Sequence, residues 1–444
     1  MASTITNVSS ETEIPFSILD TDLYKLTMQN AVLQHFHDAV VVIKFTNRAP
    51  QMLFSRTSFD WIQEQVNRMS SLRLTSEERV ALAKACPYFP QSYLDYLSEI
   101  SLDPQSQVAL KFLSKSTEGE IELGEIECVI EGVWRDCILY EVPVMSIISE
   151  GYFKYTDTDW KLDDIVSRRA KRKAHLLLSP PNGITPLAFS EFGTRRRRSF
   201  HVQDLVVKSL VEGWQEWKKG GGTGGGLVGT SNVYLALKYG IPPSGTIAHE
   251  WIMAVGATYG YKGANGRAMD MWEAVYPPSP TSSLHTMLTD TYTAAEFFSE
   301  MTANPERALR WNALRQDSGD PMTFARAAKK AWQDIGETSG KKRVIFSDGL
   351  TRYRAIDLQR QCDQLGILAA FGIGTSFTND FVKVSDPTQK SEPLNIVIKL
   401  NRIDGKGCVK LSDDKGKYTG EPEEVQKVLE VLKISDKDVE KRAG

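Results

Sequence analysis

Short apolar runs alternate with stretches of helical periodicity through the middle of the chain. The runs lie at residues 187–189, 226–228, 246–248, 286–288, 313–314, 344–346 and 368–371. After most of them, apolar residues recur every three or four positions, as on one face of a helix. These helical patterns cover residues 233–239, 252–257, 294–301, 323–332 and 353–362. The alternation predicts parallel strands joined by crossover helices.

The number of units allows two architectures for this region. Seven short runs in about 190 residues could form either a closed barrel or an open wound sheet, and periodicity does not distinguish them. Polar signatures follow most of the runs, and in a barrel all of these strand ends face one mouth. We therefore predict an irregular α/β barrel over residues 146–384.

The two ends of the chain have a different pattern. Apolar and polar residues alternate there as in half-exposed antiparallel strands, at residues 40–45, 120–123, 125–130, 393–400 and 408–411. Helical patterns cover residues 58–66 and 76–86, the second with Thr75 or Ser76 as N-cap. We predict a discontinuous α+β domain, built from residues 1–145 and 385–444, around the barrel.

Composition narrows the functional class. The 444 residues carry a net charge of −3 with 41% hydrophobic residues, so no global charge draws the protein to nucleic acid or an anionic membrane. The five scattered cysteines form no CxxC pair, which argues against a zinc site or a disulfide framework. The first residues lack a secretory pattern, and no apolar run could span a bilayer. We predict a cytoplasmic protein, and a nuclear share is left open.

Four polar signatures carry the candidate chemistry: EFGTRRRR from residue 191, GTIAHEW from residue 245, RQDSGDP from residue 315 and GIGTSFTND from residue 372. His249 follows an apolar run and precedes a helix. A lone histidine is most often a hydrogen-bonded core residue. Here arginines and aspartates share the predicted mouth, so His249 is a candidate base or nucleophile, and Asp290 could orient it.

The charged and glycine-rich signatures suit phosphates. Four arginines, residues 195–198, could form a solvated or nucleic-acid-binding face, but a pocket for several phosphates fits the chain's charge better. Asp317 and Asp320 could hold ribose hydroxyls or magnesium with a diphosphate, while Asp320 before Pro321 could also cap a helix. Gly349 and the glycines of residues 372–374 allow a close backbone approach to phosphate. The run of glycines at residues 220–226 matches no phosphate loop and predicts a surface connection.

These motifs together resemble the nicotinate phosphoribosyltransferases, most closely the fungal type. The resemblance rests on LDTDLYKLTMQNAV, EFGTRRRRS, GTSN, GTIAHEW, TDTY, RQDSGDP, FGIGTSFTND and SEPLNIVIKL, from about residue 19 to residue 411. It implies the type II phosphoribosyltransferase fold, with a discontinuous α/β domain and an irregular α/β barrel. The implied reaction converts nicotinate and phosphoribosyl pyrophosphate to nicotinate mononucleotide and pyrophosphate, coupled to ATP hydrolysis, in the salvage of nicotinic acid for NAD.

The resemblance also implies roles for individual residues. His249 is implied to be phosphorylated by ATP, with Asp290 orienting it. Tyr24 and Phe192 would sandwich the pyridine ring, with Tyr24 reaching from a neighbouring subunit, and this shared site implies a homodimer. Thr246 would contact nicotinate.

The remaining implied contacts concern the substrates' charged groups. Arg315 would contact the nicotinate carboxylate and Arg195 a phosphate. Asp317 would bind ribose hydroxyls, and Gly349 and Thr375 would form phosphate turns. Mg²⁺ is implied as cofactor and ATP as co-substrate.

Other functions compete with this interpretation. Nicotinamide phosphoribosyltransferase has similar motifs, but in that family an aspartate at the position of Ser231 accepts from the substrate amide. A serine hydroxyl could instead donate to the carboxylate of nicotinate. Quinolinate phosphoribosyltransferase would need more basic groups, and a non-catalytic regulator would be expected to have lost His249, Asp290 or Asp317. A nucleic-acid-binding role fits the charge balance poorly.

Overall fold

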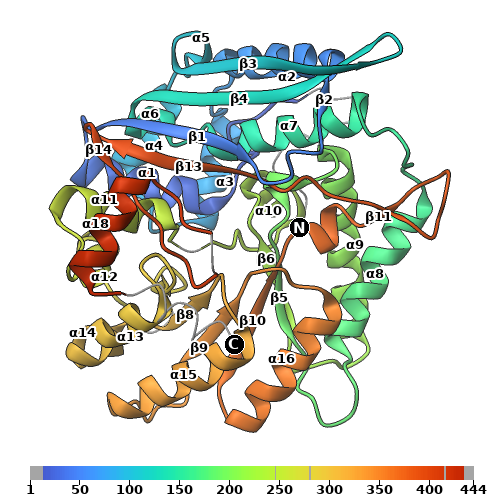
Figure 1. Ribbon diagram of the computed structural model, residues 1–444. Coiled ribbons are helices and arrows are strands. Elements are labelled where there is room, and N and C mark those ends of the chain that lie inside the picture. The colour runs from blue at the N-terminus through green and yellow to red at the C-terminus, as the bar shows by residue number, and fades with distance from the viewer. Residues whose placement is uncertain (1–13, 246, 280–281, 415–416, 435–444) are drawn as a thin grey trace.

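The computed structural model describes residues 14–434, except residue 246 and the pairs 280–281 and 415–416. The expectation that the first residues form no secretory signal concerns residues before 14, which lie outside this range. In the view of Figure 1, an antiparallel sheet lies above a parallel sheet, and helices surround both.

The antiparallel sheet combines strands from both ends of the chain. Its order is β14-β13-β1-β4-β2, with β3 paired to β4. Its strands are β1 (Val40–Asn47), β2 (Phe54–Ser55), β3 (Val108–Glu118), β4 (Ile121–Val133), β13 (Ile396–Ile403) and β14 (Lys406–Gly407). β1 pairs directly with β13, so the predicted flanking strands do share one sheet. A separate pair joins β11 (Phe381–Val382) to β12 (Lys390–Ser391).

One predicted flanking strand is wrong. Residues 408–411 form only an isolated bridge, between Lys410 and Thr419. The backbone N–H groups of this segment donate to carbonyls on different elements, including Asn401 and Thr291. The segment therefore crosses from the antiparallel sheet to the parallel one instead of extending either.

The parallel sheet has the order β6-β5-β10-β9-β8-β7. Its strands are β5 (Ala188–Glu191), β6 (Gly226–Thr230), β7 (Thr286–Leu288), β8 (Ala313–Gln316), β9 (Arg343–Phe346) and β10 (Leu368–Ile373). Six of the seven predicted runs are thus strands, joined by helical connections, in agreement with the α/β fold class. Among the described residues no ladder joins β6 to β7, so the barrel is irregular.

The seventh predicted strand, residues 246–248, does not form within its described part. Only Pro243 makes a parallel bridge, to Thr230, and Ser244 N–H donates to the Thr230 carbonyl at 2.8 Å. Pro242 and Pro243 have no N–H to donate, so strand pairing cannot propagate there. The chain instead passes directly into the helix that begins at His249.

The helices agree closely with the sequence periodicity. The first part of the chain contains α1 (Leu23–His35), α2 (Arg56–Arg68), α3 (Ser76–Ala85), α4 (Gln91–Glu99), α5 (Pro104–Gln107), α6 (Trp134–Cys137), α7 (Glu141–Tyr155), α8 (Asp164–Leu178) and α9 (Phe200–Lys219). The second contains α10 (Val233–Tyr239), α11 (His249–Tyr259), α12 (Ala264–Val275), α13 (Ala294–Ala303), α14 (Pro305–Arg310), α15 (Pro321–Asp334), α16 (Arg352–Leu365), α17 (Thr375–Thr378) and α18 (Pro422–Leu432). Two short 3₁₀ helices are Met69–Ser71 and Thr194–Arg196. α3 begins at the predicted cap, because Thr75 and Glu78 form a capping box.

One continuous apolar core joins both sheets and the helices between them. The five cysteines are free and buried within it. The run of glycines connects the end of α9 to the start of β6. None of the helices in the described part of the chain has the length and apolar character needed to cross a bilayer.

Candidate active site

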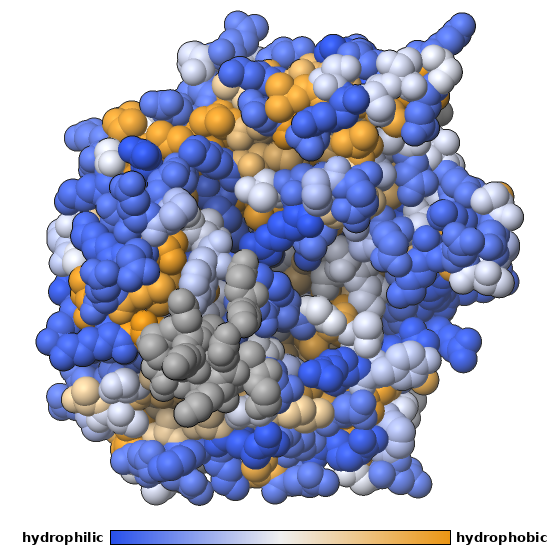
Figure 2. Space-filling view, viewed as in Figure 1, coloured by the Kyte–Doolittle hydropathy of each residue, from blue (hydrophilic) through white to orange (hydrophobic). Residues whose placement is uncertain are grey.

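The carboxyl ends of the parallel strands bring most of the predicted site residues together. Asp290 follows β7, Asp317 follows β8, Gly349 follows β9 and Thr375 follows β10. Parallel strands direct their carboxyl ends to one edge, so segments far apart in the sequence meet there. In the view of Figure 2, this side of the molecule is mainly hydrophilic and has a hollow near its middle.

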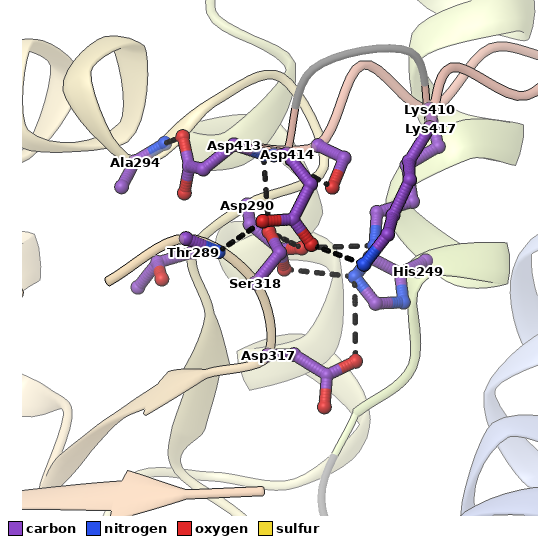
Figure 3. A network of polar contacts seen from close by, with 12 residues as sticks. His249, Thr289, Asp290, Ala294, Asp317, Ser318, Lys410, Asp413, Asp414 and Lys417 are labelled. Atoms are coloured by element: carbon purple, nitrogen blue, oxygen red, sulfur yellow. Dashed lines mark hydrogen bonds and ion pairs between the residues drawn. The ribbon is translucent and has the colours of Figure 1, made fainter. Parts of the chain in front are cut away.

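His249 belongs to a charged network drawn in Figure 3. Its Nε2 lies 2.8 Å from Oδ1 of Asp290. The other oxygen of Asp290 accepts from the Ser318 hydroxyl at 2.6 Å and pairs with Nζ of Lys410 at 2.8 Å. Because a buried ionised carboxylate only accepts, Nε2 of His249 carries the proton and Nδ1 has the lone pair.

Burial and charge set the protonation of this network. Burial, followed by the nearby charge of Lys410, lowers the pKa of His249 to about 4, although Asp290 opposes the shift. Burial alone would raise the pKa of Asp290, but Lys410 and His249 hold it well below its usual range. At neutral pH the site therefore contains a neutral imidazole beside an ionised carboxylate, the arrangement needed for a nucleophilic histidine.

Asp317 is held rigidly next to this network. Its Oδ1 accepts from Nη2 of Arg315 at 2.9 Å and from the Ser347 hydroxyl at 2.6 Å, and its Oδ2 lies 4.0 Å from Nε2 of His249. Burial would raise the pKa of Asp317, but Arg315 and His249 lower it well below its usual range. Asp320 has a different role, because it caps α15 by accepting from Thr323 N–H at 2.7 Å.

Two adjoining cavities share Arg195 and Arg315 in their walls. The first, here called the His249 cavity, is lined by Tyr24, Glu141, Arg195, Ala248, His249, Glu250, Met253, Arg315, Asp317, Ile398, Lys399 and Leu400. The second, here called the phosphate-turn cavity, is lined by Phe192, Gly193, Arg195, Arg196, Arg315, Ser347, Gly349, Leu350, Gly374 and Thr375. A ligand with anionic groups at both ends could therefore extend from one cavity to the other past these two arginines.

Local backbone geometry shapes the phosphate-turn cavity. Gly349 has a φ of +55°, which turns the chain after β9 in a conformation that favours glycine. A Cβ at Gly372 would lie 2.4 Å from the ring of Phe192, so only glycine lets this ring pack over the end of β10. The aromatic wall of the site therefore depends on Gly372.

The chain matches known proteins along most of its length. Residues 187–436 match the model of the nicotinate phosphoribosyltransferase (NAPRTase) family, and residues 19–149 match the model of its N-terminal domain. A relative named nicotinate phosphoribosyltransferase from Saccharomyces cerevisiae is 39% identical over 428 residues, 95% of this chain and 96% of the relative. The chain belongs to the nicotinate phosphoribosyltransferase family.

Further relatives, one of them a solved structure, extend the match to three dimensions. A nicotinate phosphoribosyltransferase from Chromohalobacter salexigens is 38% identical over 425 residues, 94% of this chain and 98% of the relative. The crystal structure of nicotinate phosphoribosyltransferase from Porphyromonas gingivalis is 36% identical, with a TM-score of 0.81 over 95% of this chain and all of that chain. This likeness agrees with the predicted type II phosphoribosyltransferase fold.

Membership in the family makes the position of Tyr24 informative. Tyr24 lies on α1 and lines the His249 cavity of its own chain, with its ring 5.8 Å from the Arg195 guanidinium carbon. This corrects the expectation that Tyr24 reaches the site from a neighbouring subunit. One chain supplies both this tyrosine and His249, and the homodimer that the resemblance implies stays a prediction.

Only half of the arginine run faces the cavities. Arg195 and Arg196 line them, whereas Arg197 and Arg198 are fully buried elsewhere. Arg197 forms two hydrogen bonds of 2.7 Å to Asp20, and Arg198 packs its guanidinium 3.6 Å from the ring centre of Phe153. The prediction of a four-arginine phosphate pocket is therefore wrong for the last two, which hold the core together.

Two predicted nicotinate contacts need separate comment. Thr246 lies outside the described residues. The hydroxyl of Ser231 is buried and donates to Oδ1 of Asp22 at 2.7 Å, and Ser231 is absent from the walls of both cavities. Its donation to nicotinate remains a prediction.

Sequence reasoning missed several charged residues of the site, among them Lys410, Lys399, Glu141 and Glu250. Lys410 and Lys399 come from the C-terminal part of the chain, and Glu141 begins α7. Lys399 did carry a signal, since it is the one charged residue in the otherwise apolar stretch of residues 396–400. Nothing in the sequence indicated that residues 408–412 would reach Asp290.

Proposed function

We propose that this protein transfers the phosphoribosyl group of phosphoribosyl pyrophosphate to nicotinate, forming nicotinate mononucleotide and pyrophosphate for NAD biosynthesis. The observation that carries the proposal is the meeting of Tyr24, the His249–Asp290 pair and the phosphate-turn cavity around Arg195 and Arg315. Relatives that bear the name of this activity match more than nine-tenths of the chain. The named family members thus support the substrate, and the geometry supports the chemistry.

The proposed binding mode follows the two cavities. The 5′-phosphate lies at the turns of Gly349 and Thr375, and the diphosphate and nicotinate lie toward His249. The pyridine ring stacks on Tyr24 and Phe192, and the carboxylate of nicotinate pairs with a cationic side chain such as Arg315. This arrangement holds the ring nitrogen and the anomeric carbon at reacting distance.

In the proposed transfer step, the bond from the anomeric carbon to the diphosphate oxygen breaks as the bond to the pyridine nitrogen forms. The ribose becomes oxocarbenium-like, and the ionised carboxylate of Asp317 stabilises its positive charge while binding ribose hydroxyls. Arg195 offsets the charge that develops on the departing diphosphate. Asp317 is already positioned by Arg315 and Ser347, and Arg195 by Asp22 and Glu141, so little reorganisation is needed.

We further propose that ATP phosphorylates His249. The lone pair of Nδ1 attacks the terminal phosphorus of ATP, a P–N bond forms, and the P–O bond to ADP breaks. Asp290 accepts the hydrogen bond from Nε2 and stabilises the positive charge that the ring acquires. Water later hydrolyses the phosphohistidine to phosphate, so ATP drives a change in the site and not the glycosidic bond formation itself.

Magnesium fits this site as a companion of the diphosphate. In the described residues, no group of three or more histidine, cysteine, aspartate or glutamate side chains is arranged to hold a metal ion. Mg²⁺ is commonly bound by substrate phosphates and water with one or two carboxylates, and Asp317 is available for that role. When bound, the ion neutralises diphosphate charge.

Nicotinate is favoured over nicotinamide by the charges of the His249 cavity. Arg195 and Arg315 line it, and a guanidinium group suits a carboxylate better than a neutral amide. This support does not depend on Ser231, whose hydroxyl donates to Asp22. A cytoplasmic location, with a nuclear share left open, remains a prediction.

The ATP step is tested by measuring nicotinate mononucleotide formation with and without ATP in the wild type and in His249→Ala. We expect ATP to stimulate the wild type and to have no effect on the variant, which should retain a low ATP-independent rate. A His249→Ala enzyme that ATP still stimulates would exclude the phosphohistidine.

A further inference from the structure

One lysine of the His249 cavity has no counter-charge in contact with it. Lys399 lies on β13 and lines the cavity beside Tyr24, Arg195 and His249. In the described part of the chain, its ammonium group has neither a hydrogen bond nor an ion pair within 4.0 Å. A partly buried cation without such a partner is costly, so its position calls for a functional explanation.

The carboxylates around Lys399 are engaged by other groups. Glu141 and Glu250 both pair with the buried ammonium of Lys25. Asp317 pairs with Arg315 at 2.9 Å. Each anion that could neutralise Lys399 therefore already has a partner of its own.

The neighbouring strand increases the cost of this position. Lys399 lies directly opposite Lys44 of β1 in the antiparallel ladder, and like charges in such cross-strand pairs are destabilising. Lys44 forms an ion pair with Glu421 at 3.3 Å, whereas Lys399 points into the cavity. The sheet thus tolerates a lysine that weakens it, in an otherwise apolar part of β13.

We propose that Lys399 binds the diphosphate group, both in phosphoribosyl pyrophosphate and in the pyrophosphate product. This inference rests on the proposed function and assigns a residue to its diphosphate. The phosphate-turn cavity holds the other end of the same substrate, and Lys399 is absent from its walls. A sugar phosphate bound there extends its anomeric substituent past Arg195 and Arg315 toward Lys399.

The charge of the cavity favours a diphosphate over a carboxylate at Lys399. The three carboxylates of the cavity walls are engaged by Lys25 and Arg315, so the charge of Lys399 is left for a ligand in addition to the arginines. A lysine ammonium acts as a compact point charge suited to phosphate oxygens, whereas arginine supplies the fork that matches a carboxylate. Arg315 can therefore serve nicotinate, while Lys399 and Arg195 serve the diphosphate.

The protonation of Lys399 responds to such a ligand. Burial, with added repulsion from Arg195 and Lys410, lowers the pKa of Lys399 to about 8, while Glu141 and Asp317 oppose this shift. The neighbouring His249 is neutral over the same range. A bound polyanion would raise the pKa of Lys399 and hold its proton, so affinity should fall as pH rises through about 8 in the free protein.

The test is calorimetric titration of the full chain with magnesium pyrophosphate at pH 7.5 and pH 9.5. The variants are Lys399→Met, Lys399→Arg and, as matched control, Lys111→Met, which removes an exposed lysine from β3 of the same sheet. We expect Lys399→Met to bind pyrophosphate at least tenfold more weakly at pH 7.5, with the KM for phosphoribosyl pyrophosphate raised and the KM for nicotinate within twofold. Lys111→Met should match the wild type.

The arginine variant provides a second criterion that does not depend on the methionine variant folding. Because arginine stays charged, Lys399→Arg should lose less pyrophosphate affinity between pH 7.5 and pH 9.5 than the wild type. The change in protonation of pyrophosphate itself affects both proteins equally, so it does not alter this comparison. Equal pyrophosphate affinity in Lys399→Met and wild type, or a loss confined to the KM for nicotinate, would overturn the proposal. If pyrophosphate binding depends on Lys399 but nicotinate is not converted, the proposed function fails and the diphosphate site stands.

Discussion

Removing the charge of Lys410 should move the acidic limit of ATP-stimulated activity toward neutral pH. Lys410 lies 2.8 Å from Asp290, and after burial its charge is the largest cause of the low pKa of His249, about 4 against an ordinary value of 6.5. That difference of about 2.5 pKa units corresponds to about 3 kcal/mol in favour of the neutral imidazole. In Lys410→Met, Asp290 pairs with a protonated His249 without this competition, and the pKa of His249 rises.

The direction and size of the effect follow from the protonation of the nucleophile. The imidazole attacks only when neutral, so ATP stimulation is present above the pKa of His249 and disappears as pH falls through it. At pH 5, a pKa of about 4 leaves about nine-tenths of His249 neutral. A full return to 6.5 would leave about 3% neutral, so the loss in Lys410→Met has an upper limit of about thirtyfold, because burial continues to lower the pKa of His249 in the variant.

The assay measures ATP-stimulated product formation from pH 5 to pH 8 and divides it by the ATP-independent rate at each pH. Lys410→Arg should keep the wild-type profile, because it retains the charge beside Asp290. Lys417→Met is a matched control in the same segment, since Lys417 is exposed and pairs with Asp414 at 2.6 Å. Profiles of Lys410→Met and wild type that coincide would refute the assignment of Lys410 as the group that keeps His249 neutral.

Three further expectations concern other parts of the molecule. Arg197→Met leaves Asp20 buried without its partner and should cost about 3 to 5 kcal/mol of unfolding free energy in urea, whereas Arg195→Met should mainly lower activity. Burial and the charge of Asp290 raise the folded-state pKa of Asp413 to about 7, so its contribution to stability is lost as pH rises through that value. Because this loss accumulates between the ordinary pKa of about 4 and the folded value of about 7, Asp413→Asn should raise Tm more at pH 8 than at pH 5, and equal gains at both pH values would contradict this. Specific activity should not fall on dilution to nanomolar concentration, because Tyr24 lines the cavity of its own chain.

The sequence predicted the parts of the fold that depend on local pattern. Helix α10 and strand β7 have the predicted bounds, because short apolar runs and helical periodicity reflect burial along the chain itself. The strand expected at residues 246–248 failed for a reason that periodicity does not measure. Residues 247 and 248 lead directly into α11, which begins at His249.

The site was predictable where each residue follows a strand and less so where distant segments meet. Asp290 and Asp317 were found because the carboxyl ends of neighbouring parallel strands converge. Lys410 was missed because the alternation of its segment predicted a strand of the antiparallel sheet, whereas the segment crosses to the parallel sheet. The arginine run shows the opposite error, since residue type alone does not tell Arg195, which lines a cavity, from Arg198, which packs against aromatic rings.

The most direct test of the proposed function is a competition between the two pyridine bases. The purified protein is supplied with phosphoribosyl pyrophosphate, Mg²⁺, ATP and equal concentrations of nicotinate and nicotinamide, and both mononucleotides are quantified by mass spectrometry. We expect nicotinate mononucleotide to predominate. Predominance of nicotinamide mononucleotide, or the absence of both products, would contradict the proposed function.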